Sequence, residues 1–173
     1  MSRVYIALGS NIEPRLHIAK ALELLSATVS IGAVSTFYWT EAIGRPEQGD
    51  YLNGVICVET GVAPHELKSV TLRGIEAELG RVRSTDKYAA RTIDLDVLVY
   101  ADLVLAEEGF VLPDPDVLER PFLACGLLEL EPSLKWPGSG RLLKECIDPI
   151  AFADLRADVE FSRILKERWF HES

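Results

Sequence analysis

Two aspartates stand one residue apart directly after a group of basic residues, and this spacing is the clearest chemical signal in the sequence. Asp94 and Asp96 lie on a strand-like run within RVRSTDKYAARTIDLDVLVY, residues 81–100. Side chains two apart on a strand project to the same side, so the two carboxylates would stand about 6–7 Å apart on one face. The opposite side, which we expect to face the core, would carry Ile93, Leu95, Val97 and Val99.

Such a pair has the chemistry of a magnesium site. Mg²⁺ is commonly held by one or two carboxylates together with substrate phosphates, and two ions about 3.5–4 Å apart can stabilise the attacking and leaving oxygens of a phosphoryl transfer. An isolated D-x-D pattern has low specificity, because an exposed strand can simply carry two solvated acids. The loop before it adds four cations against one acid, Asp86: Arg81, Arg83, Lys87 and Arg91. Basic groups beside metal-binding acids suit polyphosphate transfer, with a solvated charged turn as the alternative.

The composition restricts the class of protein. The chain has 173 residues, 48% of them apolar and 26% charged, with a net charge of −9. We expect one domain over residues 1–173 that buries a core without disulfides. No apolar run approaches the roughly 20 residues that span a bilayer, and the start does not resemble a secretory signal, so we expect a cytoplasmic protein without a membrane partner. The net acidity argues against nucleic acid and leaves a small anion as the partner of the basic loop.

Hydrophobic patterning predicts the element order βαββαβ. Strands are expected at 3–9, 33–40, 51–60 and about 92–100. A first helix should follow a cap at Ser10 or Asn11 with Pro14 in its first turn, and a second should run from Pro64 to residue 79, ended by Gly80. The order is that of a ferredoxin-like plait, an α+β fold with an antiparallel sheet, helices on one face and C-terminal helical additions. The other face would then be available for ligands.

The C-terminal third is expected to add helices to this plait. Pro121 opens one helical segment, and Asp148 with Pro149 is a suitable start for a last helix toward Trp169. Residues 160–173 would form a helical extension. The apolar side chains that could dock it on the domain or on another subunit are Phe161, Ile164, Leu165 and Trp169.

Several segments, in the same order, resemble one enzyme family. The similarity covers about residues 3 to 160, and the R-x-x-D-x-D strand with DYLN upstream is its most specific part. The segments are VYIALGSN, FYWTEAIG, DYLN, GRVR and AARTIDLDVL. They resemble 6-hydroxymethyl-7,8-dihydropterin pyrophosphokinase of folate biosynthesis. The resemblance implies a Mg²⁺-dependent transfer of pyrophosphate from ATP to the hydroxymethyl group of the pterin, releasing AMP, on a ferredoxin-like fold.

The resemblance also implies roles for individual residues. Asp94 and Asp96 would bind two Mg²⁺ ions, and Arg81 and Arg91 would meet the triphosphate, so that these four form the catalytic set. The nucleotide-binding set would comprise Glu76, Arg83, Arg91, Val97 and Arg120. The pterin-binding set would comprise Thr40, Ile43, Tyr51, Asn53 and Phe122.

General chemistry agrees with the pterin-binding set. Two aromatic rings, Tyr51 and Phe122, suit a flat heterocycle, and Asn53 offers both a donor and an acceptor to a pyrimidinone edge. Without the resemblance, plain core packing of both rings is an equal alternative. The loops 41–50 and 81–91 would close over the substrates and exclude water. The expected partners are small molecules only, ATP and the reduced pterin, with the protein as a monomer or weak homodimer.

The departures from the family fall on the nucleotide side. Asp114 stands where a histidine is expected, and Gly109 and Val111 lack polar groups that some members direct toward ATP. These differences keep two further hypotheses open. One is a pterin-binding homologue with weak or lost pyrophosphoryl transfer, and the other is a generic nucleotide-binding module.

Overall fold

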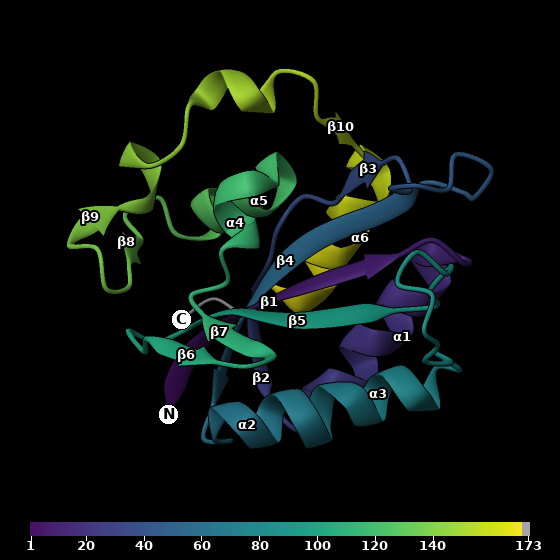
Figure 1. The fold of residues 1–173 in the computed structure, drawn as a ribbon, viewed down its shortest axis with the longest axis horizontal. Helices are drawn as coiled ribbons and strands as arrows, with labels where there is room; N and C mark the ends of the chain where they lie inside the picture. Colours follow the sequence, from purple (N-terminus) through teal and green to yellow (C-terminus); the bar gives the residue numbers. More distant parts are fainter. Residues whose placement is uncertain (171–173) are drawn as a thin grey trace.

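The computed structural model describes residues 1–170, and their sheet confirms the predicted ferredoxin-like topology (Figure 1). All pairings are antiparallel, in the order β10-β3-β4-β1-β5, and β2 also pairs with β4. The strands are β1 (Ser2–Ser10), β2 (Ser30–Val34), β3 (Tyr38–Thr40), β4 (Tyr51–Thr60), β5 (Asp94–Tyr100) and β10 (Arg156–Ala157). Since β2 and β3 share one neighbour, they form one broken strand at the edge of a four-strand plait.

The break between β2 and β3 corrects the expectation of a continuous strand at 33–40. Phe37 is fully buried there, and a Cβ on Gly54 of β4 would lie 2.5 Å from its ring. The backbone NH of Phe37 donates to the Ser162 hydroxyl at 2.8 Å instead of continuing the ladder. The chain therefore turns its aromatic ring into the core where the strand breaks, and glycine on β4 provides the space.

The predicted helical face is confirmed, and its helices lie below and behind the sheet in Figure 1. They are α1 (Pro14–Ser26), α2 (Pro64–Glu66), the π-helical segment Leu67–Leu72, α3 (Arg73–Glu78) and α6 (Val159–Trp169). The predicted cap of α1 at Ser10 or Asn11 is wrong. Glu13 precedes the helix with φ 41° and no side-chain cap, while the Ser10 hydroxyl donates to the Ile12 carbonyl. Gly80 ends the second helical stretch with φ 84°, as predicted.

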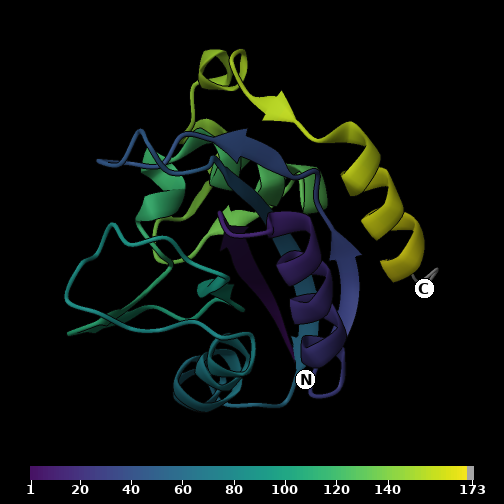
Figure 2. The same ribbon diagram turned by 90° about the vertical axis from the view of Figure 1, so that its right-hand side faces the viewer.

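The opposite face of the sheet is only partly open. Helix α5 (Pro121–Leu130) packs on β4, where a Cβ on Gly126 would lie 2.9 Å from Val55. Figure 2, turned by 90°, shows α5 and α1 on opposite sides of the sheet. The remaining elements of this side are α4 (Asp116–Glu119), the hairpin β8 (Lys135–Trp136) and β9 (Arg141–Leu142), and the 3-10 turns Leu143–Glu145 and Pro149–Phe152. The hairpin β6 (Leu105–Glu107) and β7 (Phe110–Leu112) packs instead with the core of the helical face. Ligand space is thereby confined to the end of the sheet that carries the two aspartates.

The last helix starts later than predicted. Asp148 caps only the short 3-10 turn, whereas α6 begins at Val159, where the Asp158 carboxylate accepts from the Phe161 NH at 3.2 Å. Within the predicted extension, Phe161 and Leu165 are buried in the core of the same chain and Ile164 is exposed. Trp169 packs partly buried against that core. Residues 171–173, the end of the predicted extension, lie outside the described residues.

A bulge in β5 changes the side to which its end points. Tyr5 pairs with Val99 and Ile6 with Val97, so Leu98 is an extra residue. Beyond the bulge, Val99 lies with Leu98 in a second hydrophobic core, which packs beneath α5. The prediction that Val99 faces the same side as Val97 is therefore wrong. The aspartates precede the bulge and share one face, as predicted. Among residues 1–170, no helix has both the length and the apolar character needed to cross a bilayer.

Candidate active site

A cavity of about 600 Å³ opens at the end of the sheet beside the two loops predicted to cover the substrates. All five residues of the predicted pterin-binding set line it: Thr40, Ile43, Tyr51, Asn53 and Phe122. Asp94, Arg91 and Arg120 line the same space. The structure thus brings two aromatic rings, an amide and one metal-binding candidate into a single hollow, which we call the first cavity.

Asn53 is held in a fixed orientation within the first cavity. It is buried, and its Nδ2 donates to the Thr40 hydroxyl at 2.8 Å. Gly9 lies opposite on β1, and a Cβ there would stand 2.8 Å from Asn53 Oδ1. Glycine is therefore required for the close approach of the amide. We did not predict this role from the sequence, although Gly9 is the last residue of the first strand expected there.

A second cavity, of about 220 Å³, lies on the other side of the aspartate pair. Its lining combines side chains from four parts of the chain: Lys68, Asp96, Val97, Gly109, Phe110, Val111, Asp114 and Pro115. A small third cavity, of about 60 Å³, is lined by both Asp94 and Asp96 and by Asp114, Asp116 and Arg120. Asp94 therefore faces the first cavity, Asp96 faces the second, and the third joins them.

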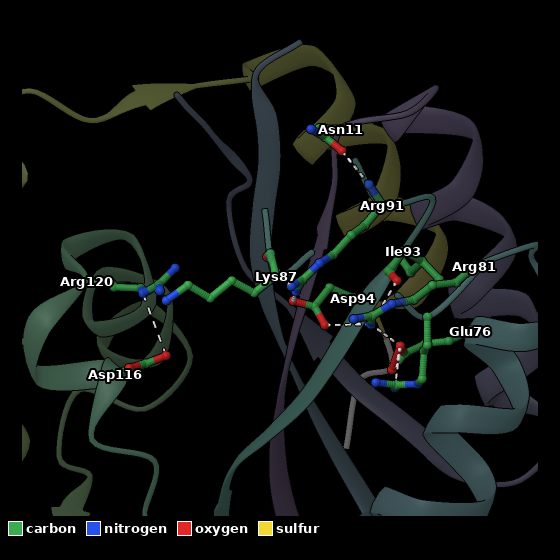
Figure 3. A network of polar contacts seen from close by, with 10 residues as sticks. Asn11, Glu76, Arg81, Lys87, Arg91, Ile93, Asp94, Asp116 and Arg120 are labelled. Carbon is green, nitrogen blue, oxygen red and sulfur yellow. Dashed lines mark hydrogen bonds and ion pairs between the residues drawn. The ribbon is translucent and has the colours of Figure 1, made fainter. Parts of the chain in front are cut away.

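Asp94 is neutralised by two guanidinium groups, as Figure 3 shows. Arg81 Nη1 lies 2.8 Å from Asp94 Oδ1, and Arg91 Nη1 lies 2.8 Å from Asp94 Oδ2. Behind them, buried Glu76 accepts from Arg81 and, at 3.2 Å, from Arg83. Burial raises the pKa of Glu76, and Arg81 and Arg83 act against that rise. The positive charge that the adjacent carboxylates need is thus present on the same strand face.

The predicted nucleotide-binding set divides into two groups. Arg91, Val97 and Arg120 line one or more of the three cavities. Glu76 stands behind Asp94 and lines none of the three, and the same holds for Arg83, whose side chain is 54% exposed. Arg81, of the predicted catalytic set, also lines none of them. Although burial acts to lower it, Asp94 and Glu76 hold the pKa of Arg81 above its ordinary value. Arg81 is therefore a permanent cation whose present partners are both carboxylates.

Asp96 differs sharply from Asp94 in its surroundings. It keeps an exposed edge but stands in a hollow beside Asp94 and Asp114, and no ion pair with it occurs among the described residues. Loss of solvation, followed by the charges of Asp94 and Asp114, raises the pKa of Asp96 to about 7. A divalent cation would relieve this repulsion.

The donor set fits magnesium that is shared with a substrate. Within residues 1–170, no three His, Cys, Asp or Glu side chains converge as a complete metal site. Two carboxylates facing a cavity are the usual protein contribution to a Mg²⁺ ion that also binds phosphates and water. Asp94 and Asp96 would hold such an ion, and the ion would supply charge for the phosphate oxygens.

The two loops beside the first cavity contact each other. Arg45 pairs with Asp86, and Gln48 Nε2 donates to the Tyr88 carbonyl at 2.9 Å. Gly44, at φ 73°, lies against the Tyr88 ring. The loops 41–50 and 81–91 are therefore already linked at the mouth of the cavity.

Two further residues complete this mouth. Asn11 exchanges hydrogen bonds with the Arg91 backbone, Oδ1 accepting from its NH at 2.7 Å and the Asn11 NH donating to its carbonyl at 3.1 Å. Lys87 lines the first cavity, and its side chain reaches toward Arg120 in Figure 3. Asn11 had been predicted only as a helix cap, and Lys87 only as part of a basic loop. Their three-dimensional neighbours could not be found from local patterns.

Comparison with known proteins identifies the family. The sequence model described as 7,8-dihydro-6-hydroxymethylpterin-pyrophosphokinase (HPPK) matches residues 5–132. Two relatives carry the name 2-amino-4-hydroxy-6-hydroxymethyldihydropteridine pyrophosphokinase. That of Aquifex aeolicus is 37% identical, covering 84% of this chain and 90% of its own length. That of Methylorubrum extorquens is 41% identical, with 78% and 85% covered.

A solved structure agrees at the level of the fold. The crystal structure of Plasmodium falciparum HPPK-DHPS matches with a TM-score of 0.63 at 14% identity, over 84% of this chain and 43% of that longer one. The sequence matches and the fold match thus indicate one family, in agreement with the cavities described above. The chain belongs to the 7,8-dihydro-6-hydroxymethylpterin-pyrophosphokinase family.

Proposed function

We infer that this protein transfers pyrophosphate from ATP to the hydroxymethyl group of 6-hydroxymethyl-7,8-dihydropterin, releasing AMP, as a step of folate biosynthesis. Membership of the family supports the activity. The observation that carries it in the structure is the aspartate pair between two cavities, one of them lined by all five residues expected to bind the pterin. No observation favours the pterin-binding homologue without transfer.

The first cavity is the proposed pterin site. Tyr51 and Phe122 would contact the two faces or edges of the heterocycle, and Asn53 would pair with its amide-like edge. The Asn53 amide is already oriented by Thr40, so little side-chain freedom would be lost on binding. The hydroxymethyl group would then point toward Asp94, at the border of the third cavity.

The second and third cavities are the proposed sites of the nucleotide. In the transfer, the hydroxymethyl oxygen of the pterin forms a bond to the β-phosphorus of ATP. The bond between the β-phosphorus and the oxygen that bridges it to the α-phosphorus breaks, and AMP leaves. Arg120 lines both the first and the third cavity, Arg91 lines the first, and both would bind non-bridging oxygens. Arg81 would contribute charge from behind Asp94. Most of the rate should come from positioning and charge neutralisation.

We propose two Mg²⁺ ions at Asp94 and Asp96. The support is the position of both carboxylates on the third cavity and the charge repulsion at Asp96. We also propose that residues 1–173 form a single domain and that the protein acts in the cytoplasm as a monomer or weak homodimer. Sedimentation and cell fractionation test the last two proposals.

The activity is tested by measuring AMP with ATP, Mg²⁺ and the hydroxymethyl pterin. We expect AMP and the pterin diphosphate in equal amounts, and none without the pterin or the metal ion. Pterin binding without formation of AMP would contradict the proposed transfer and support a binding protein instead.

A further inference from the structure

The second cavity contains one cation that no part of the proposed mechanism uses. Among the described residues that line it, Asp96 and Asp114 are acids and Lys68 is the single base. A polyphosphate would meet two carboxylates there, and the Mg²⁺ proposed at Asp96 would compensate only one of them. An uncompensated acid close to a phosphate costs binding energy. The charge of Asp114 therefore needs a partner from the protein.

Lys68 reaches this cavity from an irregular part of the second helical stretch. It lies in the π-helical segment Leu67–Leu72, whose first and last residues are both buried. A π-helical turn inserts an extra residue into a helix and often occurs at functional sites. The widened turn keeps Leu67 and Leu72 on the core side, and Lys68, half-buried, extends to the hairpin β6–β7.

The contacts of Lys68 leave part of its hydrogen-bonding capacity free. Its ammonium group donates to the Gly109 carbonyl and stands 4.5 Å from the centre of the Phe110 ring. An ammonium group has three N–H donors, and a ring face is a weak partner compared with a phosphate or a ribose oxygen. The group is thus positioned on the cavity wall but is not held in a buried ion pair.

Asp114 is fixed on the facing side of the same cavity. Its backbone NH donates to the Leu98 carbonyl at 2.8 Å, and its Oδ1 accepts from the Asp116 NH at 2.9 Å. Burial raises the pKa of Asp114, whereas the positive charges of Arg120 and Lys68 act to lower it. Arg120 lines the third cavity together with Asp114, and Lys68 is the cation among the described residues that line the second.

We propose that Lys68 is a nucleotide-binding residue of the second cavity, where its charge offsets that of Asp114. This inference rests on the proposed function, because ATP is the ligand that it names. It extends that function by a residue from a helix outside the predicted set. The Lys68 ammonium would move from the Gly109 carbonyl to an oxygen of the nucleotide.

The test is a double-mutant cycle read by calorimetric binding of the magnesium complex of α,β-methylene ATP, which cannot be cleaved at the reacting bridge. Lys68→Ala should weaken binding about tenfold, the size expected for one charge-assisted hydrogen bond. Asp114→Asn keeps the oxygen that accepts from the Asp116 NH. In that background we expect Lys68→Ala to cost about threefold or less.

Two controls separate this role from a structural one. Lys20→Ala removes the same charge from an exposed position on α1 and should leave nucleotide binding unchanged. Pterin binding and the melting temperature of Lys68→Ala should stay at the wild-type values. Unchanged nucleotide binding in Lys68→Ala, an equal loss in the Asp114→Asn background, or a parallel loss of pterin binding would each overturn the proposal. Failure of the proposed function would appear separately, as absence of AMP formation by the unaltered protein.

Discussion

The first and second cavities lie on either side of one aspartate pair, yet they are built differently. The first is formed by strand ends, the start of α5 and the loops 41–50 and 81–91, and its central amide is held by Thr40 and closely approached by Gly9. The second lies between a π-helical turn, a two-strand hairpin and the start of α4, with charged groups on facing walls. The first depends on shape and hydrogen bonding, whereas the second depends on a balance of charge. Mutations in the two cavities should therefore differ in which ligand they affect and in how large the effect is.

The largest expected effects come from the two aspartates that line the third cavity. Asp96→Ala should lower the rate of AMP formation about a hundredfold, because the metal ions and the phosphates would lose a carboxylate partner. Asp94→Ala should cost at least as much, since it also releases Arg81 and Arg91 from their shared partner. Steady-state assays with saturating Mg²⁺ measure both. Near-native rates in either variant would remove the metal-binding role.

The next effect should be confined to the first cavity. Asn53→Ala removes a buried, hydrogen-bonded amide, and we expect pterin affinity to fall about tenfold, as for the loss of one or two hydrogen bonds. Binding of Mg²⁺-nucleotide should stay within about twofold, because the Asn53 amide bonds Thr40 of the first cavity and Asn53 does not line the second. Calorimetric titration with each ligand gives the two affinities. Equal losses for both ligands would mean that the cavities are not independent.

The stability of the protein should depend on pH because of Asp96, which stands between the two cavities. Asp96 has a pKa of about 7 in the folded, metal-free protein, against about 3.9 for an unfolded aspartate. The folded state then binds more protons between about pH 4 and 7, so the free energy of unfolding should fall as the pH rises through this window. Mg²⁺ should recover stability at pH 8 more than at pH 5.

Thermal melting of the wild type and of Asp96→Asn, with and without Mg²⁺, measures this effect. Asparagine has no proton to lose, so the stability of Asp96→Asn should depend less on pH over the same window. A wild-type protein that gains stability between pH 5 and 7 without metal would argue against the raised pKa.

The smallest expected effect is that of a substitution at Arg83, which stands behind the site. The Arg83 side chain is 54% exposed and contacts Glu76, which keeps its contact with Arg81 in any case. An exposed ion pair contributes about 0–1 kcal/mol, so Arg83→Ala should change the rate by roughly fivefold at most. A loss as large as that of Asp96→Ala would show that the Arg83 side chain reaches the phosphates during the reaction.

The plait and the shared face of Asp94 and Asp96 could be predicted for a physical reason, because strand periodicity sets which side chains share a face. The residues that line the first cavity were instead implied by the resemblance to the family. Errors arose where tertiary contacts override local preference. The burial of Phe37 breaks the expected strand at 33–40, and a bulge at Leu98 turns Val99 to the other core.

The second cavity was less accessible to sequence reasoning. Lys68 and Asp114 are far apart in the chain, and only the folding of a hairpin against a π-helical turn brings them to one space. Helical patterning identified the stretch from Pro64 to residue 79 but gave no sign of the extra residue in its turn. The departures at Gly109 and Val111 indicated a change on the nucleotide side without indicating what compensates for it.

The most direct test of the aspartate pair as the junction of two separate sites is a pair of titrations on Asp96→Asn. We predict that the pterin binds with an affinity within about threefold of the wild type, while the magnesium complex of α,β-methylene ATP binds about a hundredfold more weakly. Wild-type affinity for the nucleotide complex in this variant would contradict the account.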